Sequence, residues 1–287
     1  MPVVVIGASG QVGRALVPRL VERGPEVRAV VRRRDAAEDL RGLGAKVAVD
    51  DLSDPEGLGM LFHDAHTVCH LAGGLDAPED RVEEANLGTV RRTLEGAARA
   101  GIRRFLFLSY PGADPHAGNP YLRAKGRAEE EIRASGLEHA VVRSTHVYGP
   151  ASRWLEETAG AARGAVATVI GTGRQRLAPV FVDDVAAVLA AADDRAAGIG
   201  GTYGLQGPDE VTADALVDLL AGRRRRKVHL GVGTAGRLTA LAGRRLPRHA
   251  IEILAADSLA DAPDAAAEFG VAATPLEIGL ARSLGGR

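Results

Sequence analysis

The stretch that decides the fold is Val3-Val4-Val5-Ile6-Gly7-Ala8-Ser9-Gly10-Gln11-Val12-Gly13. Its first four residues are apolar and predict a buried strand, and residues 12–22 have the apolar spacing of a helix. Three glycines, with two residues between successive ones, allow a sharp turn and leave room for a pyrophosphate beside the backbone. The helix N-terminus adds unpaired N–H groups and the positive end of its dipole. Together, strand, turn and helix predict a dinucleotide-binding motif rather than a purely structural turn.

Short apolar runs and helical patterns continue to alternate through the first half of the chain. Further strands, each expected to be buried on both faces, are predicted at residues 27–31, 46–49, 67–71, 104–108 and 139–143. Helices are predicted between them at residues 36–41, 55–62, 86–100 and 121–134. This alternation favours right-handed crossovers between parallel strands. The predicted fold class is therefore α/β, with a Rossmann-type doubly wound parallel sheet.

The pattern changes after Pro150. Residues 151–178 are rich in Ala and Gly with few strand runs, and a short strand is predicted at 180–185. Helices are predicted at 185–192, capped by Asp183 or Asp184, and at 212–220. We expect a dinucleotide-binding domain made of residues 1–150 and about 179–206. A smaller, mainly helical C-terminal substrate-binding lobe would be made of about 151–178 and 207–287.

Composition excludes several classes of function. The chain has 287 residues, enough for one large α/β unit and an appendage. Its 36 Lys and Arg against 37 Asp and Glu give a net charge of −1, which offers no positive field to a polyanion. Aromatic residues make up 3%, too few for stacking nucleic-acid bases. The basic run at 223–227 is therefore expected to be a solvated edge strand or loop rather than a nucleic-acid site.

The amino-acid composition also gives expectations about metal binding, binding partners and cellular location. The single cysteine, Cys69, excludes a disulfide framework, and the eight histidines show no metal-ligand spacing, so we expect no metal. No apolar stretch approaches the roughly 20 residues of a membrane helix, and the N-terminus has no secretory pattern. We expect a cytoplasmic protein with a small-molecule substrate and neither nucleic acid nor membrane as a partner. Its oligomeric state is left open, a homodimer being one option.

The end of the second predicted strand bears on the choice of dinucleotide. An acid there would bind the ribose 2′-hydroxyl of NAD, but the chain has Arg32 and Arg33. A guanidinium matches a 2′-phosphate through two parallel hydrogen bonds, so NADP(H) is favoured over NAD(H). Arg32 is the first candidate and Arg33 the second, although either could simply begin a solvated loop. After the third strand, Asp51 is placed to hold the adenine amino group.

These residues, with others spread over most of the chain, resemble the short-chain dehydrogenase/reductase superfamily. The resemblance is to its extended and atypical members, which include NmrA-like and NAD-dependent epimerase/dehydratase-like proteins. The segments that carry it are Gly7/Gly10/Gly13, Asp51-Leu52, 70–73, 86–89, 97–101, 105–109, 121–125, 142–150, 182–186 and 268–280.

The resemblance implies a catalytic set of Ser109, Tyr121 and Lys125. Tyr121 would give or take the substrate proton, and Ser109 would hydrogen-bond the reacting carbonyl oxygen. Lys125 would bind the nicotinamide ribose and lower the pKa of the tyrosine, since residues four apart share a helix face. The alternative for Tyr121 is an ordinary helix residue whose hydroxyl is satisfied locally. Asn86 would organise backbone rather than act directly.

The resemblance also implies cofactor contacts from the glycine turn and from the ends of later strands. Besides Arg32, Arg33 and Asp51, these residues are Gly7, Ser9, Gly10, Gln11, Val12, Gly13, Leu52, Leu71, Ala72, Gly73, Asn86, Lys125, Ser144, His146 and Val147. The chain departs from the pattern at residues 143–146, where extended members usually have Arg-Pro-Gly. His146 could add a polar contact near the substrate, or it could be a solvent-facing loop histidine.

The function expected from these features is an NADP(H)-dependent short-chain dehydrogenase/reductase-like enzyme. It would act as a ketoreductase or alcohol dehydrogenase on a small organic carbonyl or secondary alcohol. Two alternatives stay open: an epimerase, dehydratase or isomerase that retains its nicotinamide cofactor, and a non-catalytic NADP-binding sensor or scaffold protein. The substrate pocket is expected to be mainly apolar with a few polar groups.

Overall fold

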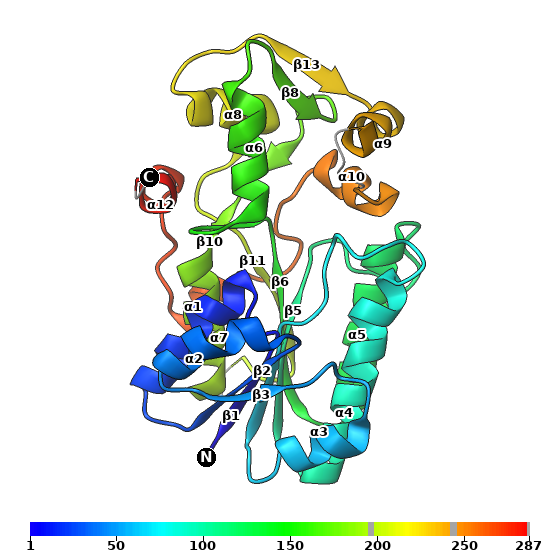
Figure 1. Cartoon of the computed structure of the whole chain (residues 1–287), viewed down its shortest axis with the longest axis vertical. Helices are drawn as coiled ribbons and strands as arrows, with labels where there is room; N and C mark the ends of the chain where they lie inside the picture. The colour runs from blue at the N-terminus through cyan, green and yellow to red at the C-terminus, as the bar shows by residue number, and fades with distance from the viewer. Residues whose placement is uncertain (195–197, 242–245, 286–287) are drawn as a thin grey trace.

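The computed structural model of the chain describes residues 1–194, 198–241 and 246–285. Its larger part is a seven-stranded parallel sheet in the order β11-β6-β5-β4-β1-β2-β3 (Figure 1). The strands are β1 (Val3–Ile6), β2 (Val27–Val31), β3 (Lys46–Val49), β4 (Thr67–His70), β5 (Arg104–Ser109), β6 (Glu138–Ser144) and β11 (Gly201–Leu205). The order reverses between β1 and β4, so the predicted doubly wound α/β sheet is confirmed.

Helices cover both faces of this sheet (Figure 1). One face carries α1 (Gln11–Glu22), α2 (Ala37–Gly42) and α7 (Val182–Asp194). The other carries α3 (Pro55–Leu61), α4 (Thr89–Ala100) and α5 (Pro120–Ala134). A π-helical turn, Glu84–Gly88, leads into α4. The predicted helices between the first six strands are therefore all present, with no end shifted by more than three residues.

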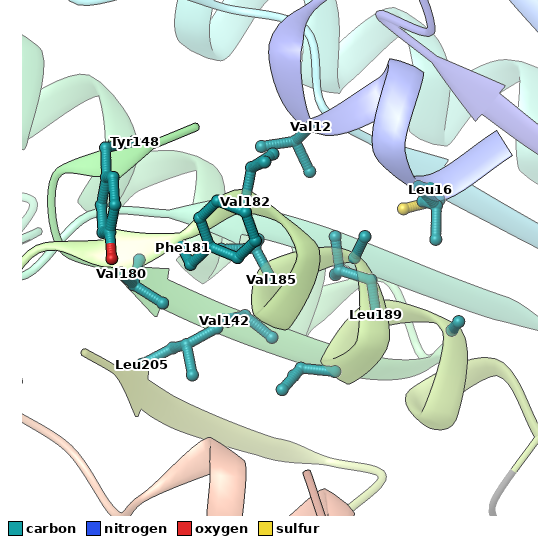
Figure 2. Packing of buried hydrophobic residues seen from close by; sticks show 14 of the residues in the cluster. Val12, Leu16, Val142, Tyr148, Val180, Phe181, Val182, Val185, Leu189 and Leu205 are labelled. Atoms are coloured by element: carbon teal, nitrogen blue, oxygen red, sulfur yellow. The ribbon is translucent and has the colours of Figure 1, made fainter. Parts of the chain in front are cut away.

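Strand pleating sorts the core into two layers. On β1, Val3 and Val5 face the α1/α7 side, whereas Val4 and Ile6 face the α3/α4/α5 side. Figure 2 shows α7 packed on the first side, with Val185 and Leu189 of this helix above the sheet. Each fully buried aliphatic side chain of this kind contributes about 1.5–3 kcal/mol. The core holds the strand ends, and hence the site above them, in fixed positions.

Strand β3 departs from the prediction that every strand is buried on both faces. Lys46 and Val49 are exposed, and only partial burial is seen between them. The reason is position: β3 pairs with β2 alone and forms the edge of the sheet.

A smaller lobe lies beyond the carboxyl ends of the strands (Figure 1). Its helices are α6 (Arg153–Arg163), α8 (Ala213–Ala221), α9 (Val232–Leu241) and α10 (Arg248–Leu254). Its strands form three two-stranded pairs: β7 (Val147–Tyr148) with β10 (Val180–Phe181), β8 (Ala167–Ile170) with β13 (Lys227–Leu230), and β9 (Arg176–Leu177) with β12 (Val211–Thr212). The expected mainly helical C-terminal region is present. Apart from Val180–Phe181 and the edge strand or loop expected at residues 223–227, these short strands and helix α6 were not predicted.

The C-terminal segment returns to the large sheet. Helix α11 (Ala265–Phe269) contacts α7 and β11, and α12 (Leu276–Leu284) contacts β10. The division into two domains at about residues 150, 179 and 207 stays a prediction. Residues 195–197, 242–245 and 286–287 of those ranges lie outside the described residues.

The predicted cap of the helix after β10 is wrong. Helix α7 begins at Val182, so Asp183 and Asp184 lie inside its first turn. Asp184 instead accepts hydrogen bonds from the backbone N–H of Thr274, at 2.7 Å, and from its hydroxyl, at 2.8 Å. This carboxylate therefore ties the C-terminal segment to α7.

Two other predictions for this half of the chain are confirmed. Helix α8 follows Thr212, whose hydroxyl accepts a hydrogen bond from the N–H of Ala215 at 3.1 Å. The basic run at 223–227 leads into the edge strand β13, and Arg223, Arg224 and Arg226 are exposed.

Candidate active site

The glycine turn after β1 brings two loops together. Gly7 has a left-handed φ of +78°, and a Cβ there would lie 2.9 Å from the backbone nitrogen of Ala72. A Cβ at Gly13 would lie 2.5 Å from Cα of Ala8, so this glycine lets α1 pack closely against the turn. The turn therefore needs glycine at both positions. It leaves the N-terminus of α1 open toward the space above the strand ends.

That space is a cavity of about 590 Å³ at the point where the strand order reverses. Nine of the predicted cofactor residues line it: Gly7, Ser9, Gly10, Arg32, Asp51, Leu52, Leu71, Ala72 and Gly73. Sequence reasoning missed a second group in its wall, Asp50, Gly74 and residues 76–78, together with Arg81, Ala85 and Thr89. Asp50 directly follows β3, and the others come from the loop after β4, the π-helical turn and the start of α4. The wall fits a dinucleotide, because glycine backbone and a helix N-terminus face one end and a guanidinium faces the other.

Arg32 and Arg33 differ in their surroundings. Arg32 lines the cavity and makes no hydrogen bond or ion pair within the described residues. Arg33 points elsewhere and is ion-paired with Asp35. Asp51 accepts a hydrogen bond from the N–H of Ser53 at 3.0 Å, and hydrogen bonding by Ser53 lowers the pKa of this carboxyl. It is therefore ionised at neutral pH and can accept a hydrogen bond from a ligand.

Asn86 holds the loop that closes the cavity. Its side-chain NH₂ donates to the carbonyls of Val82, at 2.9 Å, and Gly74, at 3.2 Å. Its Oδ1 accepts from the N–H of Gly74, also at 3.2 Å. The side chain is buried, so these bonds fix the backbone beside Gly73.

The other predicted cofactor residues do not line this cavity. Gln11, Val12 and Gly13 form the first turn of α1, behind the glycine turn. Ser144, His146 and Val147 lie where β6 leads into the small lobe, and Lys125 lies on α5. Their contacts with a cofactor stay predictions.

Tyr121 and Lys125 occupy successive turns on one face of α5. Asn119 caps this helix by accepting from the N–H of Tyr121 at 3.0 Å, so the tyrosine sits in its first turn. The Lys125 Nζ donates to the carbonyl of Leu108 at 3.0 Å and lies 5.9 Å from the centre of the Tyr121 ring. The Tyr121 hydroxyl has no hydrogen-bond partner in the part of the chain that the structure describes. The predicted pair is therefore brought together.

The predicted effect of Lys125 on Tyr121 is not seen. Burial lowers the pKa of Lys125 to about 8, partly opposed by the charge of Glu129. Burial also raises the pKa of Tyr121 above its ordinary value. Burial is the larger cause and the interaction with Tyr110 the smaller, and both raise the pKa, so Tyr121 is a neutral phenol at neutral pH.

Ser109 ends β5 with its side chain turned toward α5. Its Oγ donates to Oε1 of Glu129 at 2.6 Å, and Glu129 is fully buried and paired with Arg143 at 2.8 Å. The pleat explains this direction, because Phe105 and Phe107 belong to the same layer. A serine hydroxyl can donate one hydrogen bond, and here Ser109 donates it to the carboxylate of Glu129.

Tyr110 is a site residue that the sequence reasoning missed. Its hydroxyl lies 2.9 Å from Oγ of Ser258 and 3.4 Å from Nδ1 of His146, and its ring packs edge-on against Tyr121 with centroids 6.0 Å apart. Strand alternation contained the signal, because the residue after Ser109 must lie on the opposite side of the strand end from Ser109.

The small lobe contains a second cavity, of about 470 Å³, between α6, α8, α9, α10 and β8. His146 lies in its wall and is stacked on Trp154, with ring centroids 4.9 Å apart. His146 also contacts Tyr110, at 5.8 Å between ring centroids. A series of rings thus leads from the lobe cavity to Tyr121, and His146 is buried rather than solvent-facing.

Membrane-spanning helices and metal-binding clusters were sought among residues 1–194, 198–241 and 246–285. Their helices do not combine the length and the apolar composition that crossing a bilayer requires. Their His, Cys, Asp and Glu side chains form no group of three or more that could hold a metal ion.

The sheet order, the glycine turn and the Tyr–Lys helix define an NAD(P)H-binding protein of the extended short-chain dehydrogenase/reductase type. The chain belongs to this family: the model of an NAD(P)H-binding family matches residues 7–196.

Relatives of this chain include reductases and assembly factors. It is 33% identical over 194 residues to a ceramide reductase of Caulobacter vibrioides. The aligned region covers 66% of this chain and 60% of the reductase. It is 29% identical over 237 residues to the (4-alkanoyl-5-oxo-2,5-dihydrofuran-3-yl)methyl phosphate reductase of Streptomyces griseus, with 81% of this chain and 78% of that protein covered. It is 32% identical over 139 residues to a photosystem II assembly factor of Guillardia theta, covering 48% of this chain and 44% of that protein.

Two further relatives are much longer than the part that this chain matches, and a solved structure is similar in fold at low sequence identity. The chain spans only 35% of a chloroplast protein and 56% of a mitochondrial NADH dehydrogenase subunit, both of Arabidopsis thaliana. Among solved structures, the UDP-glucose 4-epimerase of Thermotoga maritima superposes with a TM-score of 0.77 at 23% identity, over 98% of this chain and 96% of that one. At this identity the likeness shows a shared fold.

Proposed function

We propose that this protein is an NADP(H)-dependent oxidoreductase that reduces the carbonyl group of a small organic molecule to a secondary alcohol. The observation that carries the proposal is the Tyr121–Lys125 pair, with a buried phenol whose hydroxyl has no partner among the described residues. Such a hydroxyl is free to donate a hydrogen bond to a ligand. An ordinary helix tyrosine would be satisfied locally.

The first cavity would hold the cofactor, whose nicotinamide supplies the hydride when bound. Ser9, Gly10 and the N-terminus of α1 would bind the pyrophosphate. Arg32, which has no acid partner among the described residues, would bind the 2′-phosphate and so favour NADP(H). Lys125 would donate to the ribose hydroxyls.

Tyr121 would donate its proton to the carbonyl oxygen as negative charge develops there. Its raised pKa keeps the proton on the phenol at neutral pH, which suits an acid rather than a base. The nearby ammonium of Lys125 would stabilise the phenolate that remains. The proposal therefore runs in the direction of reduction.

A second hydroxyl would orient the carbonyl, and there are two candidates. The family resemblance assigns this role to Ser109, whose proton is already donated to Glu129. Tyr110 lies beside Tyr121 and could donate to a substrate oxygen, with Ser258 and His146 as the partners that hold it. We favour Tyr110 because it can donate without breaking a bond to a buried carboxylate.

Two named reductases among the relatives support an enzyme, and the assembly factors support the non-catalytic alternative. The two can be separated by following the absorbance of NADPH with a panel of ketones and aldehydes. We expect carbonyl-dependent oxidation of NADPH, with NADH used more slowly. Cofactor binding without turnover on any carbonyl would favour a sensor or scaffold. Interconversion of stereoisomers with no net oxidation would favour the epimerase alternative.

A further inference from the structure

The lobe cavity has an apolar wall. Leu216, Val217, Leu238 and Leu254 line it, and no Lys or Arg of the described ranges does so. One carboxylate, Glu157, reaches it, and its oxygen lies 2.8 Å from Arg153. The volume of about 470 Å³ falls within the roughly 300–1,000 Å³ usual for small-molecule sites.

The end of the cavity nearest the proposed reaction centre is uncharged. Burial lowers the pKa of His146 to about 4, so its imidazole is neutral at neutral pH. Its stack on Trp154 leaves an aromatic surface at that end. A phosphate or carboxylate on a substrate would be desolvated there without a cation from the wall, which is strongly unfavourable.

One wall residue, Gln175, has a buried polar atom without a hydrogen-bond partner. The side chain of Gln175 is buried, and its NH₂ donates to the carbonyls of Ile170, at 2.6 Å, and Leu254, at 3.3 Å. These bonds fix the orientation of the amide, because only the NH₂ can donate. Its Oε1 is left buried and without a hydrogen-bond partner. An acceptor in this position calls for a hydroxyl or amide N–H from a ligand.

We propose that the lobe cavity binds an uncharged substrate with an extended apolar body, whose carbonyl end lies toward His146 and Tyr121 and which carries one hydrogen-bond donor for Gln175. Nucleotide-linked substrates are excluded from the site by this chemistry. The position of the carbonyl rests on the proposed reductase function, whereas the binding of the apolar body does not.

The chain has a single tryptophan, and Trp154 lies in the cavity wall, so its fluorescence reports binding without turnover. We would titrate the protein, with and without NADP⁺, with 2-alkanones from hexan-2-one to dodecan-2-one and with UDP-glucose. Affinity should rise about fourfold for each added methylene until the cavity is full. UDP-glucose should leave the fluorescence unchanged. Tight binding of UDP-glucose, or alkanone affinities that do not depend on chain length, would overturn the proposal.

A cavity-filling variant ties the binding to this site. Ala161 lines the cavity from α6, so Ala161→Phe should weaken dodecan-2-one binding at least tenfold while NADPH still binds. Ala98→Phe on the exposed side of α4 is the matched control and should bind like the wild type. Equal affinities in both variants would place the ligand elsewhere. If Ala161→Phe does not fold, the chain-length series on the wild type decides the matter.

The donor is tested with hydroxylated decan-2-ones that carry the hydroxyl at successive carbons. At least one isomer should bind the wild type several-fold more tightly than decan-2-one, and Gln175→Met should abolish that preference. If no isomer binds more tightly than decan-2-one, the role of Gln175 is wrong. Alkanone binding without NADPH oxidation would leave the cavity proposal standing and refute the reductase. Turnover of small polar carbonyls without alkanone binding would support the reductase and refute the cavity proposal.

Discussion

At the scale of single residues, Tyr121 is the side chain whose removal is most informative. Tyr121→Phe deletes the hydroxyl and keeps the ring against Tyr110. General acid catalysis typically contributes about 10²–10⁴-fold, so kcat should fall by that order. The Kd for NADPH should stay constant, because the hydroxyl lies outside the cofactor cavity wall. Steady-state kinetics and a cofactor titration measure both; a variant with wild-type kcat would remove Tyr121 from the mechanism.

We expect Lys125 to make the proposed reduction pH-dependent. Its pKa is lowered from 10.5 to about 8, so the ammonium beside Tyr121 is lost as the pH rises through about 8. We expect kcat/KM for reduction to be level between about pH 6 and 7 and to fall above about pH 8. Lys125→Met should give a low rate without this fall. A wild-type profile that stays level through pH 9 would contradict the assignment.

The same group affects stability with the opposite sign. Between about pH 8 and 10.5 the unfolded chain holds the Lys125 proton and the folded chain has released it. Stability therefore rises with pH across that window as far as this residue is concerned. Urea denaturation of wild type and Lys125→Met at several pH values isolates the contribution.

Substitutions can tell whether Ser109 or Tyr110 orients the substrate carbonyl. If Tyr110 orients the carbonyl, Tyr110→Phe should lower kcat about 10²-fold, as loss of an oxyanion donor typically does. Ser109→Ala should keep most activity and lower the free energy of unfolding by about 1–3 kcal/mol, since Glu129 loses a buried donor. Kinetics and urea melts on the two variants decide between them. A large loss of kcat in Ser109→Ala alone would restore the assignment based on family resemblance.

At the scale of elements, the start of α7 holds the C-terminal segment. Asp184 accepts two hydrogen bonds from Thr274, so Asp184→Ala should lower the free energy of unfolding by about 1–3 kcal/mol. Asp183→Ala, one residue earlier and more exposed, is the control and should change it by less than about 0.5 kcal/mol. Equal losses in the two variants would show that the bonds to Thr274 contribute nothing.

The elements also show what a sequence can predict. The first six strands and their helices were found because a buried strand such as Val3–Ile6 is apolar throughout and its neighbouring helices are periodic. Strand β11 was missed because Gly201–Leu205 contains two glycines and lies at an edge. In the lobe, α6 and the short strand pairs depend on contacts between segments far apart in the sequence, such as β8 with β13.

The candidate site also has a part that could be predicted from the sequence and a part that could not. The glycine turn and Arg32 are local to one strand–helix unit, so spacing alone placed them on the cofactor cavity. The direction of Ser109 and the exposure of Tyr110 to the site depend on packing against α5 and on Ser258, which is remote in sequence. The apolar cavity draws on four helices and could not be read from any one of them.

At the scale of the whole molecule, cofactor binding should stabilise the fold. A ligand at a hundred times its Kd adds about 2.7 kcal/mol to the free energy of unfolding. NADPH should therefore raise the Tm more than NADH at equal concentration. Arg32→Ala should remove this difference, because a charge-assisted contact to the 2′-phosphate is worth about 1–3 kcal/mol.

Arg33→Ala is the control for that measurement, since Arg33 is paired with Asp35 and does not line the cavity. It should keep the wild-type difference between NADPH and NADH in a thermal melt. A wild type stabilised equally by both cofactors would contradict the preference for NADP(H).

The position of β11 has a consequence for how the protein is made. This strand pairs with β6 and covers its edge, yet residues 145–200 lie between the two strands in the sequence. While the ribosome is still translating that segment, the outer N–H and C=O groups of β6 have no strand to pair with. An open edge of this kind is a template for strands of other chains. Nascent chains should therefore be most prone to aggregate, and to need a chaperone, in the interval before β11 leaves the exit tunnel.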